Sequence, residues 1–383
     1  MRTFQFINQS CYRRQEEISM VRRFFFLNGY SESGDLSATD LAILFTCAFC
    51  QSKVADMLAE IQRIRSIIKD GCELIVGSCL PKTDKAALGR IFQGRTVTPT
   101  DFSSLNELPG ITTRIEDVPW LGAADAACAV GQLVPPRPGE TADPMGKRGM
   151  GLFIASGCRR RCSYCAIRFA TGPLRSKPLP DVIAMFHAGL AAGYRQFEVH
   201  ADSIGDYGLD IGTDLGALFD EWSQDSRDFT CGIYDLHPQA FLRFLDKVQN
   251  LGATGHLHYL YVPLQSGHPR ILKQMNRPCS LPALLRGLRK FQEFPGVFLQ
   301  TSIIVGFPGE TEEEFDSTVE FLRVAAFDDI YVHCYSDMPE TKSAGMADKI
   351  DKETMKRRLD RLEGKGLRYN LAAARHEWEN LPF

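Results

Sequence analysis

The chain has 383 residues, of which 44% are hydrophobic and 24% charged, and its formal net charge is −3. This length suffices for two or three domains, and the composition is ordinary for a globular protein. The slightly negative charge excludes a protein that coats nucleic acid through bulk positive charge. No stretch has the ~20 apolar residues of a membrane span, and the N-terminus does not resemble a signal peptide, so we expect no membrane contact and a cytoplasmic location.

Twelve cysteines are many for a chain in a reducing compartment. Disulfides are rare there, so clustered cysteines indicate metal binding or catalysis. An isolated cysteine is more often a small buried apolar residue. We expect that role for the isolated ones, Cys72, Cys128, Cys231, Cys279 and Cys334.

The N-terminal part predicts a sheet with helical crossovers. Short apolar runs at 41–45 and 73–76 flank a segment, 54–68, with apolar residues at helical spacing. Strands that alternate with helices favour a parallel sheet, so we expect an α/β domain over residues 1–110. Cys11, Cys47 and Cys79 each follow a short apolar run. The carboxyl ends of the strands in a parallel sheet meet at one edge, so these three cysteines could meet there.

A proline-rich stretch, 111–147, reads as a connector. From residue 148 the alternation returns, with apolar runs that predict strands at 152–155, 196–200, 229–233, 258–262, 298–305 and 329–334. Six such units favour a partial (β/α)6 barrel over 148–345 rather than a flat doubly wound sheet. The remainder, 346–383, predicts a helical extension, with one charged amphipathic helix over 352–376.

Three cysteines directly follow the first predicted barrel strand: Cys158, Cys162 and Cys165. Three thiolates can bind three irons of a cubane cluster and leave the fourth iron open, whereas ferredoxin-type sites use four cysteines. A structural zinc site would need a second pair of ligands nearby, which the sequence lacks. The triplet therefore predicts an open 4Fe-4S cluster.

This triplet, with the aromatic Tyr164 before its last cysteine, resembles the signature of the radical S-adenosylmethionine (SAM) superfamily. The resemblance implies that SAM binds the open iron. It also implies cleavage of SAM to a 5′-deoxyadenosyl radical, which takes a hydrogen atom from the substrate.

Further segments resemble the radical SAM methylthiotransferases. The cysteine segments around Cys11, Cys47 and Cys79 look like those that bind a second, auxiliary 4Fe-4S cluster in that family; Cys50 competes with Cys47, which matches the family position better. Other matching segments are Gly172–Pro178, Ala201–Thr213, Val262–Gly267, Met275–Arg277 and Thr301–Thr311. The resemblance covers roughly residues 3–370.

Several residues are candidates for SAM contact. Gly306, Pro308 and Gly309 allow a tight turn with close backbone approach to a ligand, and also read as an ordinary strand-to-helix turn capped by Thr311. Asp202, at a strand end, could accept a hydrogen bond from the SAM amino group. Gln265 and Ser266 are candidates for the SAM or substrate side. These residues are candidates through the resemblance.

The resemblance implies a sulfur-inserting enzyme with two 4Fe-4S clusters, SAM, and a flavodoxin- or ferredoxin-type electron donor. Family members continue into a small tRNA-binding barrel where this chain ends, and Tyr335–Lys342 departs from the family's loop. We therefore expect a small metabolite or a peptide as substrate, with a tRNA nucleoside near the anticodon as the alternative. A radical SAM enzyme whose second cluster only transfers electrons, and a non-catalytic cluster sensor, are the other hypotheses.

Overall fold

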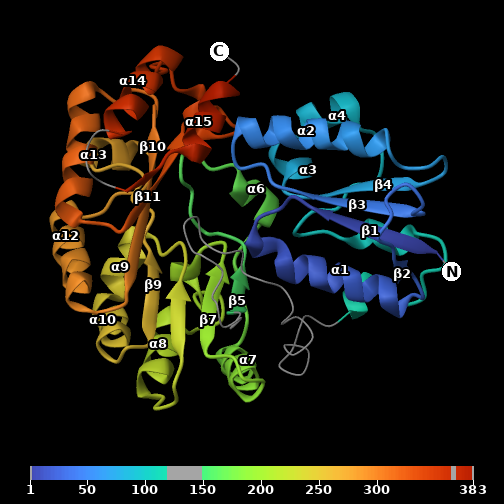
Figure 1. The fold of residues 1–383 in the computed structure, drawn as a ribbon, viewed down its shortest axis with the longest axis horizontal. Helices are drawn as coiled ribbons and strands as arrows, with labels where there is room; N and C mark the ends of the chain where they lie inside the picture. The colour runs from blue at the N-terminus through green and yellow to red at the C-terminus, as the bar shows by residue number, and fades with distance from the viewer. Residues whose placement is uncertain (1, 119–148, 364–367, 382–383) are drawn as a thin grey trace.

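The computed structural model describes residues 2–118, 149–363 and 368–381. It contains two sheets that lie side by side, each with helices packed against it (Figure 1). The first has the strand order β2-β1-β3-β4, and the second β12-β11-β10-β9-β8-β7-β5-β6. The mixed α/β class predicted from the sequence is confirmed.

The N-terminal sheet is parallel throughout. Its strands are β1 (Thr3–Asn8), β2 (Ser31–Glu32), β3 (Leu41–Thr46) and β4 (Glu73–Ser78), with helices α1 (Gln15–Leu27), α2 (Gln51–Arg65), α3 (Leu80–Thr83) and α4 (Lys85–Ile91). Every residue of β3 is buried because the strand is covered on both faces. Ile43 and Phe45 pack in the core that contains α1, whereas Ala42 and Leu44 pack in the core that contains α2. Strand periodicity thus divides one apolar run between two cores.

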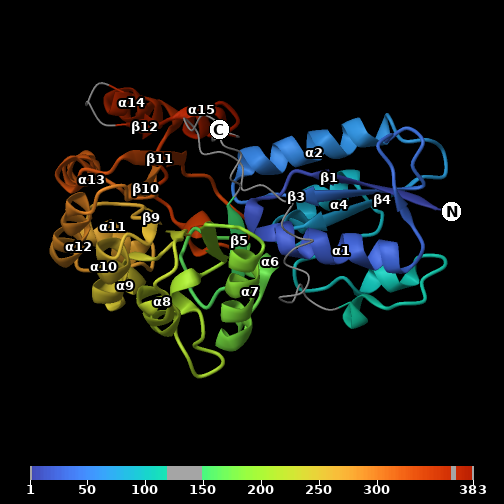
Figure 2. The same ribbon diagram turned by 60° about the horizontal axis from the view of Figure 1, so that its bottom comes forward.

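The second sheet forms the barrel, and only its β5–β6 pair is antiparallel. Its strands are β5 (Met150–Ser156), β6 (Arg175–Ser176), β7 (Gln196–Ala201), β8 (Thr230–Ile233), β9 (Leu257–Tyr261), β10 (Phe298–Val305), β11 (Asp329–Cys334) and β12 (Tyr369–Asn370). Its helices are α6 (Ile167–Thr171), α7 (Leu179–Ala191), α8 (Leu215–Gln224), α9 (Pro238–Arg243), α10 (Leu245–Ala253), α11 (Pro269–Gln274), α12 (Leu281–Arg289), α13 (Glu312–Ala325), α14 (Lys352–Glu363) and α15 (Ala372–Glu379). Helices α7, α8, α10, α12 and α13 line the outside of the curved sheet (Figure 2), whereas α6 packs in the N-terminal core that contains α2.

The inside of the barrel is polar and aromatic. On β10, Leu299 and Ile303 belong to the large apolar core under the helices. The alternate residues Gln300 and Ser302 face the other way, where the hydroxyl of Tyr259 donates to Gln300 and that of Tyr261 donates to Ser302 Oγ at 2.8 Å. A barrel whose interior carries hydrogen-bonding groups is suited to a polar ligand.

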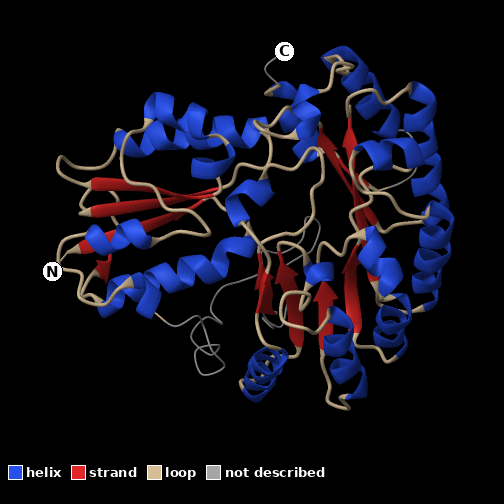
Figure 3. Ribbon diagram, turned by 180° about the vertical axis from the view of Figure 1, so that it is seen from behind, coloured by secondary structure: helices blue, strands red, loops and turns tan. Residues whose placement is uncertain are grey.

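The carboxyl ends of the N-terminal strands meet the barrel (Figure 3). After β1, Tyr12 donates its hydroxyl to Asp235 at 2.8 Å. After β3, the backbone N–H of Gln51 donates to Ser336 Oγ at 3.1 Å. The loops that follow the N-terminal strands are therefore placed against loops at the carboxyl ends of β8 and β11.

The C-terminal tail corrects one prediction. The single helix expected over 352–376 is wrong, because α14 ends at Glu363 and α15 begins at Ala372, with β12 before it. Met355, Leu359 and Ala374 do pack in the barrel core as expected of an amphipathic segment.

Most of the predicted connector and Cys128 lie outside the described residues. Of the other cysteines expected to be small buried apolar residues, Cys231 and Cys334 are buried, whereas Cys72 and Cys279 are half-buried. Within the described parts of the chain, no helix is long and apolar enough to cross a membrane. The cytoplasmic location stays a prediction.

Candidate active site

The triplet Cys158, Cys162 and Cys165 lies on the loop that leaves β5, and all three thiols are half-buried. Gly157 begins the loop with φ +79°, and a Cβ there would lie 1.9 Å from the carbonyl oxygen of Pro173. Only glycine fits this close approach. The backbone N–H of Cys158 donates to Gly172 O at 3.1 Å, so the loop is fastened at its start.

The thiols of the triplet are close enough to influence one another. Burial, together with the charges of Cys162 and Cys158, raises the pKa of the Cys165 thiol to about 11. Burial also raises the pKa of Cys158. Backbone N–H groups of Ile167 and Arg168 point at Cys165 and favour its thiolate. Thiols that repel as thiolates and accept backbone hydrogen bonds fit a group that brings positive charge, as iron does.

A three-residue segment, Met275–Arg277, supports the triplet loop from the other side. The carbonyl oxygen of Met275 accepts from Ser163 N at 3.0 Å, and Asn276 Nδ2 donates to Arg161 O at 2.8 Å. Arg277 donates to Cys162 Sγ at 3.4 Å and to Pro263 O at 2.7 Å. All three residues therefore hold the loop, and Arg277 places a buried positive charge beside a thiol.

The structure brings Cys11, Cys47 and Cys79 together, although they follow three different strands. A hydrogen bond with Cys47 lowers the pKa of the Cys11 thiol to about 6 and raises that of Cys47, with Arg13 and Arg14 also favouring the Cys11 thiolate. Burial raises the pKa of Cys79 to about 12, while the charge of Arg14 acts in the opposite direction. The expected convergence of strand ends thus places three thiols and two guanidinium groups in one region.

Cys50 points elsewhere. Its Sγ lies 3.2 Å from Ser52 Oγ and 3.9 Å from Glu377 Oε1, and burial raises its pKa to about 12. Among the described residues, no group of three or more Cys, His, Asp or Glu side chains is arranged to hold a single metal ion. The thiolates that hold a cubane cluster bind separate iron atoms, so they lie farther apart than the ligands of a single metal ion. The assignment of clusters to the two cysteine triplets stays a proposal.

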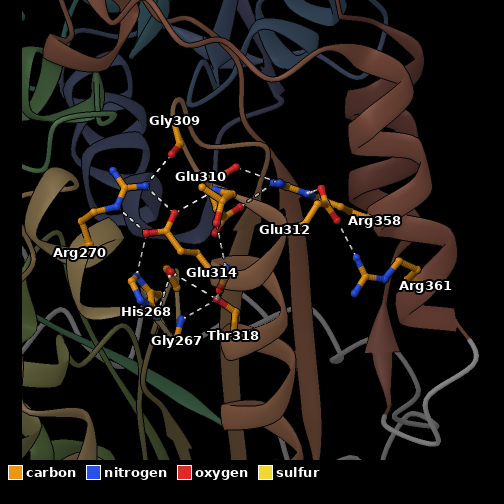
Figure 4. A network of polar contacts seen from close by, with 12 residues as sticks. Gly267, His268, Arg270, Gly309, Glu310, Glu312, Glu314, Thr318, Arg358 and Arg361 are labelled. Atoms are coloured by element: carbon orange, nitrogen blue, oxygen red, sulfur yellow. Dashed lines mark hydrogen bonds and ion pairs between the residues drawn. The ribbon is translucent and has the colours of Figure 1, made fainter.

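The turn Gly306–Gly309 is a compact strand-to-helix connection. Gly306 has φ +87°, and a Cβ there would lie 2.7 Å from Met355. Thr311 and Glu314 form the expected capping box at the start of α13. Glu310 pairs with the buried Arg358 at 2.8 Å, which ties the turn to α14 (Figure 4). Contact of Gly306, Pro308 and Gly309 with SAM stays a prediction.

Tyr164 connects this turn with the triplet loop. It packs in a small cluster with Phe307 and Tyr335, and the backbone N–H of Ser343 donates to Ser163 O at 2.9 Å. The Tyr164 ring therefore joins the triplet loop to the Gly306–Gly309 turn, the two segments for which the sequence predicts contact with SAM.

Comparison with known proteins matches residues 152–322 to the Radical SAM superfamily. The ribosomal protein uS12 methylthiotransferase RimO of Chlamydia felis (strain Fe/C-56) is 28% identical over 375 residues, which cover 92% of this chain and 76% of the relative. A probable threonylcarbamoyladenosine tRNA methylthiotransferase of Pyrococcus horikoshii is 28% identical over 352 residues, covering 88% and 77%. The chain therefore carries a Radical SAM domain and is similar over most of its length to the radical SAM methylthiotransferases. The Radical SAM domain implies one 4Fe-4S cluster and SAM as cofactors.

A solved structure of a radical SAM enzyme has a similar fold. The radical S-adenosylmethionine methyltransferase TsrM from Kitasatospora setae superposes with a TM-score of 0.60 at 16% identity, over 90% of this chain and 77% of that one. At this identity the likeness concerns the arrangement of the sheets and helices alone.

Two predicted SAM-side residues, Asp202 and Ser266, have partners within the enzyme itself. Asp202 is bound by the guanidinium of Arg14 and accepts from Gly157 N at 2.8 Å. Ser266 Oγ lies 3.3 Å from Thr318 Oγ1, so this hydroxyl faces α13. Their contacts with SAM stay predictions.

Gln265 is better placed to bind a ligand. Its backbone has φ +74°, and its Nε2 donates to Ser302 Oγ at 3.2 Å inside the barrel. Its Oε1 is buried and has no hydrogen-bond partner among the described residues. This acceptor is available to a donor on SAM or substrate.

Sequence reasoning missed the residues that join the two halves of the enzyme. Tyr12 and Arg13 both bind Asp235, and Arg14 binds Asp202 and Glu17. Arg13 and Arg14 are visible beside Cys11 in the sequence, but nothing there indicates that they pair with the distant Asp235 and Asp202.

Proposed function

We propose that this enzyme attaches a methylthio group to a side chain of a polypeptide, using two 4Fe-4S clusters. Cys158, Cys162 and Cys165 would hold the cluster that works with SAM, and Cys11, Cys47 and Cys79 the auxiliary cluster. When bound, SAM and the first cluster supply a radical that takes a hydrogen atom from a substrate carbon, and the second supplies the sulfur. An external one-electron donor of flavodoxin or ferredoxin type is required.

One observation carries this proposal: three cysteines from separate N-terminal strands approach one another where that sheet meets the barrel. The residues after Cys11 bind barrel side chains directly, with Tyr12 on Asp235 and Arg14 on Asp202. A substrate held between the sheets would therefore have one thiol triad on each side. This is the arrangement that moving sulfur to a carbon radical requires.

The choice of a polypeptide rests on the relatives and on charge. RimO relatives named for ribosomal protein uS12 align with 92% of this chain. A net charge of −3 gives little general attraction to a phosphate backbone. The relatives' names give no support to a small metabolite, and we do not propose one.

A tRNA substrate is the second candidate. Relatives named as tRNA methylthiotransferases align over a similar share of the chain. Arg159 and Arg161 are exposed on the triplet loop, where they could contact phosphate groups.

The test begins with anaerobic reconstitution, iron and sulfide counting, and Mössbauer spectroscopy. We expect about eight irons in the wild type and about four in a Cys158/Cys162/Cys165 triple-alanine variant. Four in the wild type and none in the variant would remove the auxiliary cluster and sulfur insertion.

The reconstituted enzyme is then given SAM, a reductant and either ribosomal protein uS12 or total tRNA. Mass spectrometry should find one methylthio group in place of hydrogen on the protein. Modification of tRNA alone, with a gel shift that is lost as salt rises, would replace the polypeptide with tRNA.

A further inference from the structure

His200 is a buried imidazole without hydrogen bonds. The residue is 1% exposed, and neither Nδ1 nor Nε2 has a partner among the described residues. Buried polar groups in native proteins are nearly always paired, because an unpaired group has lost its water without compensation. An unsatisfied histidine in the interior therefore calls for an explanation other than stability.

The neighbours of His200 are aromatic rings. The ring centroid of Tyr12 lies 4.5 Å away, that of Tyr234 4.7 Å and that of Phe153 5.3 Å. These are contact distances, so no planar base fits between the imidazole and its neighbours, and a ligand reaches only the ring edge. Tyr12 and Phe153 are themselves half-buried, and a ligand reaches the edge of His200 only when these rings move.

His200 lies between the elements that carry the two thiol triads. It is on β7 in register with Phe153 on β5, the strand that leads to Cys158. Tyr12, which packs against the ring of His200, directly follows Cys11. Within β7, His200 shares a face with Gln196 and Glu198, opposite to Phe197 and Val199, which belong to the core under the helices. The imidazole therefore belongs to the barrel interior.

We propose that His200 binds the substrate polypeptide by hydrogen bonds from its ring edge to a peptide or side-chain amide beside the carbon that receives sulfur. This inference rests on the proposed function and names the group of the substrate that the site recognises. It concerns binding and includes no chemical step of its own.

The chemistry of the ring favours an amide. Burial lowers the pKa of His200 to about 4, so at neutral pH the ring has one donor and one acceptor. An amide offers the complementary pair, whereas a carboxylate offers acceptors only and would leave one ring nitrogen unpaired.

His256 provides a matched control. Its ring also stacks on an aromatic side chain, Phe229, at 4.1 Å between centroids. In contrast to His200, both of its nitrogens are paired, with Phe229 O and Asp225 O at 3.0 Å each. Phenylalanine at each position keeps a planar aromatic ring, slightly larger than imidazole, and removes the nitrogens.

The experiment measures kcat and KM of the reconstituted enzyme for ribosomal protein uS12, together with iron content and Tm. We expect His200→Phe to raise KM about tenfold, from the loss of one or two neutral hydrogen bonds, with wild-type iron and a Tm that does not fall. His256→Phe should lower Tm and leave KM unchanged. His200→Asn, which keeps a donor and an acceptor, should recover part of the KM loss despite poorer packing.

Each outcome bears on one claim. A wild-type KM for His200→Phe, with uS12 modified normally, would overturn this inference and leave the proposed function intact. Equal losses in His200→Phe and His200→Asn would make His200 a packing residue and also overturn it. If the wild-type enzyme modifies tRNA and not uS12, the proposed function fails, and the inference fails with it.

Discussion

The two thiol triads are assembled in opposite ways. Cys158, Cys162 and Cys165 lie on one loop, held by its own turn at Gly157 and by Met275–Arg277. Cys11, Cys47 and Cys79 lie on three loops, and only the pairing of β1, β3 and β4 brings them together. A local sequence motif specifies the first triad, whereas the fold of a whole sheet specifies the second.

The triads also differ in how they are coupled to the rest of the molecule. The barrel triad is fastened mainly within its own half, and its one contact with the junction is the hydrogen bond from Gly157 N to Asp202 described above. The N-terminal triad lies directly beside the junction, because Arg14, three residues after Cys11, pairs there with Asp202 through buried side chains. Damage to the junction should therefore affect the N-terminal triad more than the barrel triad.

The largest effect is expected from a substitution in the barrel triad. Cys158→Ala removes one of its three thiols, so we expect complete loss of SAM cleavage, measured as 5′-deoxyadenosine by chromatography. Cys72→Ala, which changes a half-buried cysteine at the start of β4, is the matched control and should cleave SAM at the wild-type rate. Cleavage that persists in Cys158→Ala would show that this thiol is not required for SAM chemistry.

The second prediction distinguishes the roles of the two triads. Cys11→Ala should retain SAM cleavage, lose about four irons and abolish sulfur transfer, because only the auxiliary site is removed. Cys50→Ala is the control, since Cys50 faces Ser52 and Glu377. Iron analysis and product mass spectrometry give the readouts. Sulfur transfer that survives in the Cys11 variant would end the two-cluster mechanism.

The difference between a triad on one loop and a triad assembled by a sheet explains how much the sequence could predict. The sequence predicts the six longer barrel strands to within two residues, because each is an apolar run between turn residues, but it does not predict the two-residue strands β6 and β12. The approach of Cys11, Cys47 and Cys79 followed from a general property of parallel sheets. The contact of Arg14 with Asp202 had no such signal, since it depends on how the two sheets pack against each other. The unpaired state of His200 depends on the same docking, because Tyr12 covers its ring.

The third effect tests the junction. Arg14→Met leaves Glu17 and Asp202 buried without their cation, which costs about 3–5 kcal/mol. We expect a lower urea midpoint and a loss of iron from the N-terminal triad before the barrel triad. The matched change Arg22→Met breaks a partly exposed pair with Glu32, worth about 0–1 kcal/mol, and should do neither. Equal iron loss from both triads would contradict the difference in coupling.

The smallest effect concerns Arg277, whose guanidinium lies 3.4 Å from Cys162 Sγ. Hydrogen bonds and positive charge near the sulfurs raise the reduction potential of an iron–sulfur cluster. Arg277→Met should therefore lower that potential by roughly 60 mV, which corresponds to a tenfold change for one electron, and slow SAM cleavage about tenfold.

A redox titration followed by electron paramagnetic resonance measures the shift, with iron counting to show that the cluster is loaded. Arg277→Lys keeps the charge but cannot reach both Cys162 and Pro263 as the guanidinium does, so its potential should lie between those of the wild type and the methionine variant. An unchanged potential in a fully loaded Met variant would reduce Arg277 to a residue that only holds the loop. In that case the reduction potential of the barrel cluster would depend on the triplet loop alone, and not on the guanidinium beside Cys162.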